Sequence, residues 1–160
     1  MTERFPLTIS YAQIAVFDPD LENPFNDWND RQYTQGFSWR EGSVSFAVPH
    51  GNAVFVEVLT EQEKSHLSGE PTRVILVPFD IPEDKVVIGS IMDERTTVLG
   101  AGKYQLTFEL LDGGIKDGVT YEKFIRLTFA KSIAPLFEIK LADAEMNVDL
   151  PLDKNAVPAR

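Results

Sequence analysis

The chain has 160 residues, of which 43% are hydrophobic and 25% are charged, and it contains no cysteine. This composition is ordinary for one folded globular domain, and the lack of cysteine excludes thiol catalysis, disulfide bonds and thiolate metal sites. The formal net charge is −10, which disfavours direct nucleic-acid binding and fits either a basic protein partner or simple solubility.

The N-terminal sequence MTERFPLTIS lacks the apolar run and the basic start of a signal peptide. No stretch of the chain approaches 18 consecutive apolar residues, so we expect no membrane span. Together with the absence of cysteine, these features predict a cytoplasmic protein.

Apolar residues alternate with a period of two along most of the chain, which is typical of β-strands. The first run, LTISYAQIAVF at residues 7–17, changes phase between Tyr11 and Ile14, which indicates a β-bulge. Glu41-Gly42 is expected to be a turn between the next two strands. Further strands are predicted, in order, at residues 36–40, 44–48, 53–59, 73–79, 85–91, 96–99, 103–111, 122–130, 136–142 and 145–152.

Turn residues separate these runs at 50–52, 82–84, 100–102 and 112–114. Two short helical segments are candidates. In residues 59–67, Thr60 and Glu63 form a capping-box pattern that fits a short helix or a single turn; the other candidate is 29–35. The final segment KNAVPAR is expected to fray. We therefore predict one all-β domain over residues 1–160, an antiparallel β-sandwich of about eight to ten short strands.

No constellation of residues points to catalysis or to a cofactor. His50 and His66 are in no metal-binding spacing, and the chain lacks a phosphate-binding loop, a dinucleotide fingerprint and a nucleophile elbow. The adjacent acids, such as Glu83-Asp84, fall in predicted turns. We therefore predict a protein that is not an enzyme and that holds no cofactor or metal.

The stretch DPDLENPFNDWND, residues 18–30, carries five carboxylates and no basic residue. It fits a hydrated loop, a cation site or a surface for a basic partner. Asp18-x-Asp20-x-Glu22 resembles the start of a calcium-binding loop, but Asn23 and Asn29 replace the Gly and Glu that an EF-hand requires. A looser calcium site, in a non-catalytic ligand-binding sandwich, stays as the alternative function.

Trp28 lies between Asp27 and Asp30 in this stretch. One interpretation is that its ring closes the end of the sandwich. The other is that it anchors a protein partner, since tryptophan is over-represented among the residues that dominate interface energies. The acids around it would suit a partner surface rich in lysine and arginine.

Two motifs are distinctive: DW-x-D at 27–30 with the following QGF at 35–37, and SIM-x-ER at 90–95. With the strand sequences around them, they make residues 7–111 resemble the competence protein J family, also called Nin. Residues 112–160, the C-terminal strands and tail, extend beyond this resemblance.

The resemblance implies a bacterial protein that inhibits a DNA-entry nuclease. An acidic surface of this chain could block the basic groove of such a nuclease. The alternative partner is a nuclease toxin, for which this chain would be the immunity protein. From the residues themselves we predict two partner-binding patches. They are Asp18, Asp20, Glu22, Asp27, Trp28 and Asp30, and Asp93, Glu94 and Arg95.

Overall fold

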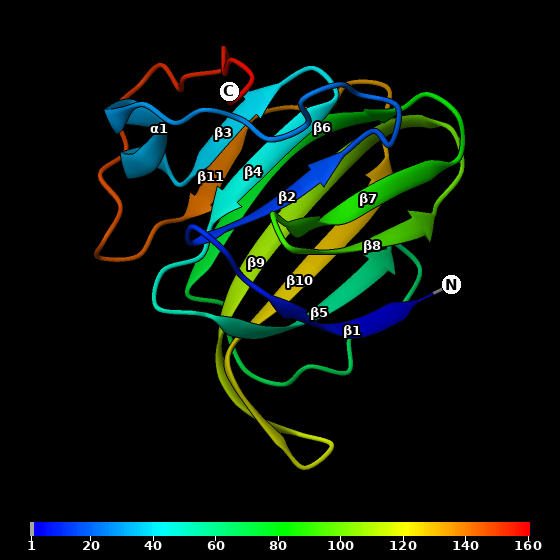
Figure 1. Ribbon diagram of the computed structural model, residues 1–160, viewed down its shortest axis with the longest axis vertical. Coiled ribbons are helices and arrows are strands. Elements are labelled where there is room, and N and C mark those ends of the chain that lie inside the picture. The colour runs from blue at the N-terminus through cyan, green and yellow to red at the C-terminus, as the bar shows by residue number, and fades with distance from the viewer. Residues whose placement is uncertain (1) are drawn as a thin grey trace.

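The computed structural model describes residues 2–160, and within them eleven strands form two facing sheets (Figure 1), which confirms the predicted all-β class. The first sheet has, in spatial order, β1 (Glu3–Thr8), β5 (Ala53–Thr60), β10 (Val119–Lys131), β9 (Gly102–Lys116), β6 (Arg73–Ile81) and β11 (Glu138–Leu141). The second has β3 (Phe37–Arg40), β4 (Ser43–Ala47), β2 (Gln13–Phe17), β7 (Lys85–Ser90) and β8 (Asp93–Val98). Neighbouring strands are antiparallel apart from the parallel pair β5 and β10.

The core lies between the two sheets and follows the alternation read from the sequence. On β9, the inward side chains from Tyr104 to Leu110 are buried, and the residues between them are not. Phe108 of β9 stacks on Phe46 of β4, with ring centroids 4.4 Å apart. The apolar faces of both sheets are therefore buried against each other, as in other aligned sandwiches.

The first predicted strand is two strands in two different sheets, so the predicted β-bulge is wrong. Tyr11 and Ala12 have φ angles of 54° and 52°, and Ser10 bridges Gln13. Positive φ at both central residues is the mark of a type I′ turn. The phase of the alternation changes because this two-residue turn carries the chain from β1 into the opposite sheet.

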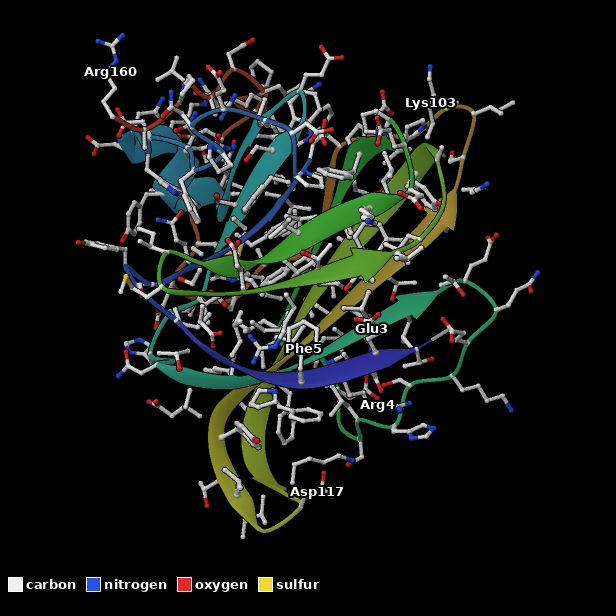
Figure 2. All side chains as sticks on the ribbon, turned by 45° about the vertical axis from the view of Figure 1, so that its right-hand side comes forward. Glu3, Arg4, Phe5, Lys103, Asp117 and Arg160 are labelled. Atoms are coloured by element: carbon white, nitrogen blue, oxygen red, sulfur yellow. The ribbon has the colours of Figure 1, made fainter. Side chains whose placement is uncertain are left out.

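The predicted turn at Asp112-Gly113-Gly114 is also wrong, since these residues continue β9. The chain reverses at Asp117 and Gly118, both with positive φ. As a result, β9 and β10 extend past the sheet as a two-stranded arm (Figure 1), and Asp117 marks its tip (Figure 2).

Of the two helical candidates, only the first in chain order is a helix. Helix α1 spans Asp30–Gln35, with Asn29 as N-cap in a capping box and Gly36 ending it at φ 90°. The Thr60 pattern closes a single turn instead: the Glu63 carboxylate accepts bonds of 2.9 Å from both the N–H and the hydroxyl of Thr60. Within residues 2–160, no helix is long and apolar enough to cross a membrane.

The segment after β11 runs from the edge of the first sheet past α1 towards β3 (Figure 1). The strand predicted at 145–152 is absent, although Met146 and Leu152 pack against the core. The predicted fraying of KNAVPAR is wrong as well, because Ala156 is buried and its N–H donates to the Trp39 carbonyl at 2.9 Å.

Candidate protein-binding face

The acidic stretch runs from the end of β2 back to its start, which separates its charges into two groups. Asp18 follows β2, and its N–H donates to the Gly42 carbonyl at 3.0 Å. Trp28 donates from Nε1 to Oε1 of Gln13, the first residue of β2, at 3.0 Å. Five residues of strand separate these two points, about 15 Å at the usual rise per residue.

The middle of the stretch is fixed to the outer face of the second sheet. Phe25 meets the ring of Phe17 edge to face, with centroids 5.5 Å apart. Asn26 is buried, and its Nδ2 donates to the carbonyls of Ser38 and Ser43 at 2.8 and 3.2 Å. The apolar and amide residues that a solvated loop would not need therefore anchor this one.

Asp18, Asp20 and Glu22 do not converge on a common point that a cation could occupy. The Asp18 carboxylate accepts a bond from the N–H of Asp20 at 3.1 Å, which shapes a local turn, and Asp20 and Glu22 are exposed. Across residues 2–160, no group of three or more His, Cys, Asp or Glu side chains is placed to hold a metal ion. This loop therefore provides no cluster of ligands for the calcium site that the alternative function requires.

Trp28 lines an open hollow of about 750 Å³ at the other end of β2. Its indole is half-buried and lies edge to face on Tyr33 of α1, with ring centroids 5.6 Å apart. The apolar lining comes from five separate segments of the chain, at residues 11–12, 28–33, 47, 91 and 159, and Gln13, Asn26, Asp27 and Arg160 add polar groups. The hollow is therefore assembled by the fold.

Several large apolar side chains around this hollow are exposed to solvent. The exposed fraction is 80% for Tyr11, 61% for Tyr33, 41% for Ile91 and 83% for Met92. Aromatic residues and methionine are enriched at the centres of protein interfaces. We call these residues, with Trp28 and the exposed acids Asp27, Asp30 and Glu94 beside them in sequence, the Trp28 face.

The hairpin between β7 and β8 brings the second motif to this face. Ser90 accepts a bond from the Ser10 N–H at 2.7 Å, and its hydroxyl lies within 3.0 Å of the Ser10 and Gln13 carbonyls. The Ile91-Met92 turn is thereby held beside the Tyr11-Ala12 turn. The fold thus joins DW-x-D and SIM-x-ER, which are more than sixty residues apart in the sequence.

Two residues of the predicted second patch are engaged within the fold. Asp93 accepts a bond from the Thr8 N–H at 2.9 Å and pairs with Arg95 at 2.7 Å. The bond from Thr8, with that from Arg95, holds the pKa of Asp93 below its usual value despite the opposing effect of burial. Arg95 also lies over the Phe5 ring, 5.6 Å from its centroid. These contacts tie β8 to β1, whereas Glu94 between them is exposed.

Sequence reasoning missed Tyr11, Tyr33 and Met92. The alternation predicts Tyr11 on a strand face, and no pattern in the sequence distinguishes an exposed aromatic residue in a turn from a buried one in a strand. Met92 belongs to the SIM-x-ER motif, and this motif is the feature of the sequence that points to it.

Comparison with known proteins gives the following matches. The family model for competence protein J matches residues 6–130. A DNA-entry nuclease inhibitor of Bacillus subtilis strain 168 is 33% identical over 102 residues, which cover 63% of this chain and 76% of the relative. The crystal structure of ComJ from Bacillus subtilis, described as an inhibitor of the DNA-degrading activity of NucA, superposes with a TM-score of 0.66 at 26% identity, covering 81% of this chain and 96% of that one.

A more distant solved structure, the product of crocagin biosynthetic gene J, has a TM-score of 0.50 at 14% identity. It covers 80% of this chain and 96% of its own. At that identity the similarity shows a shared fold alone.

Proposed function

This chain belongs to the competence protein J family, and we propose that it is a protein inhibitor that binds a DNA nuclease through the Trp28 face. Its relatives are described as a nuclease inhibitor and as an inhibitor of NucA, so the family acts by binding and not by catalysis. The observation that supports the location is the meeting of both distinctive motifs around one exposed apolar hollow.

The inhibition that we propose is competition for the groove in which a nuclease holds DNA. A protein that binds phosphates presents a basic surface, and this chain carries a net charge of −10. Asp27, which lines the hollow, and the exposed Asp30 and Glu94, which are near Trp28 and Met92 in the sequence, would meet basic residues at the rim of that groove. Charges at a rim mainly speed association, whereas a buried aromatic centre mainly slows dissociation.

We further propose that the partner is a DNA-entry nuclease of the same cell and that the two proteins meet in the cytoplasm. The first part rests on the family relationship, and the second on the sequence alone.

The face can be tested by comparing variants in a DNA-cleavage assay with the nuclease encoded nearest to the gene. Met92→Ala and Tyr33→Ala remove exposed side chains, so the fold should tolerate them. Truncating a residue that dominates an interface costs more than about 1 kcal/mol, or at least about fivefold in the inhibition constant. Ile133→Ala, at a side chain 98% exposed outside the face, is the matched control and should change nothing. Equal potency of all three variants would refute the location.

A further inference from the structure

Residues 156–160 lie outside the part of the chain that matches the family, which ends at residue 130, yet they reach the Trp28 hollow. Ala159 and Arg160 line the hollow together with Trp28 and Tyr33. Figure 2 shows Arg160 beside α1, with its side chain pointing outwards from the sandwich. One wall of the candidate site is therefore built by a segment beyond the family match.

This segment pairs with the loop that carries Trp28. The Asp27 N–H donates to the Val157 carbonyl at 2.8 Å, and the Ala159 N–H donates to the Phe25 carbonyl at 2.9 Å. Between these two bonds, Asn26 and Pro158 form an antiparallel bridge. The segment thus acts as a short strand that is added to residues 25–27.

The same segment is anchored at its base to α1. The buried Gln35 amide donates to the Asp153 carbonyl and accepts from the Asp153 N–H, both at 2.9 Å. The Asp153 carboxylate accepts a bond from Nδ2 of Asn29, the residue after Trp28, at 3.0 Å. That bond, with one from the Asn155 N–H, holds the pKa of Asp153 below its usual value. Both sides of Trp28 are consequently bonded to the C-terminal segment.

We infer that residues 156–160 form a strap that positions Trp28 in the nuclease-binding surface, so that this surface depends on a segment beyond the family match. This inference rests on the proposed function. Without the strap, the N–H of Asp27 and the carbonyl of Phe25 would lose the protein partners described above. Residues 25–27 would then be held mainly by the buried side chain of Asn26, and the backbone on either side of it would move more freely. Trp28 would then sample several positions. The apparent affinity for the nuclease falls in proportion to the fraction of molecules in which Trp28 is in the position that binds.

The test deletes residues 156–160 and, as a smaller change, introduces Ala159→Pro, which removes only the N–H that bonds Phe25. Both variants keep the anchor at Asp153. We expect the inhibition constant to rise at least tenfold for the deletion, and the Asp27 amide to exchange at least tenfold faster. The Phe108 amide in β9 should exchange as before, and Val157→Ala, which keeps the backbone bonds, should act like the unaltered chain.

A merely structural role is distinguished by combining the deletion with Trp28→Ala. If the strap acts through Trp28, the double variant will inhibit little worse than Trp28→Ala alone, because the two changes are not additive. Additive losses, or a deleted chain as potent as the full chain, would overturn the strap while leaving the proposed function intact. A full chain that fails to inhibit would overturn the proposed function itself, and with it the inference.

Discussion

The ion pair between Arg73 and Asp143 should dominate the attachment of the C-terminal segment to the first sheet. The two side chains are 3% and 22% exposed, and their bonds are 2.8 Å from Nε and 2.9 Å from Nη2 to the two carboxylate oxygens. Burial opposes ionisation of Asp143, but the hydrogen bonds and charge of Arg73 outweigh it and lower the pKa of the carboxyl group.

Replacing Asp143 with alanine leaves a buried guanidinium without its counter-ion. Breaking a fully buried pair in this way costs about 3 to 5 kcal/mol. Because about a fifth of Asp143 is exposed, water can partly replace it, and we expect a loss of about 2 to 3 kcal/mol in the free energy of unfolding. For a chain of this length, that loss lowers the melting temperature by about 4 to 12 °C.

Thermal and denaturant unfolding would measure this loss against a matched substitution. Asp112→Ala removes a carboxylate that is 82% exposed and 3.4 Å from Lys123, so it should cost less than about 0.5 kcal/mol. The double change Arg73→Met with Asp143→Leu should recover most of the loss, since a packed apolar pair can replace a buried ion pair. A cost for Asp143→Ala as small as that of the control would refute the reasoning.

Three further outcomes are expected. Hydrogen bonds from Thr2 and Thr60 lower the pKa of Glu63 from 4.5 to about 2. The stability that they add is complete above pH 4.5 and is lost as the pH falls towards 2. Acid unfolding followed by circular dichroism should show that Glu63→Gln lacks this pH-dependent part of the stability. Ala12→Gly should raise the melting temperature, because the left-handed backbone at φ 52° strains any residue with a Cβ; a lower value would contradict this. The association rate with the nuclease should fall several-fold as salt rises, while the dissociation rate changes little; a rate insensitive to salt would argue against an acidic rim.

Most strands could be predicted because apolar alternation directly reports which side chains face the core. Alternation is misleading where a segment has no neighbouring strand. Residues 145–152 alternate, yet they pair with no strand, and their apolar residues Met146 and Leu152 pack against the core from an irregular segment. The phase change at Tyr11 was visible in the sequence, but a bulge and a change of sheet produce the same pattern.

Of the candidate site, the residues around Trp28 could be predicted from the sequence, but the neighbours that the fold brings to them could not. Trp28 and its flanking acids stand out in the sequence because they lie in an irregular, charged stretch. Their junction with Ile91 and Met92 depends on the order of strands in the second sheet, which no local pattern encodes. Conversely, Asp93 and Arg95 look like surface charges in the sequence, whereas in the fold they pair with each other and with β1.

The most direct test of nuclease inhibition is to titrate the full chain into a DNA-cleavage assay with the nuclease encoded nearest to the gene. We predict a linear loss of cleavage that ends near one equivalent, which requires a dissociation constant well below the enzyme concentration, and a joint peak of the two proteins on a sizing column. Undiminished cleavage in excess inhibitor, with the two proteins eluting separately, would contradict that nuclease as the partner.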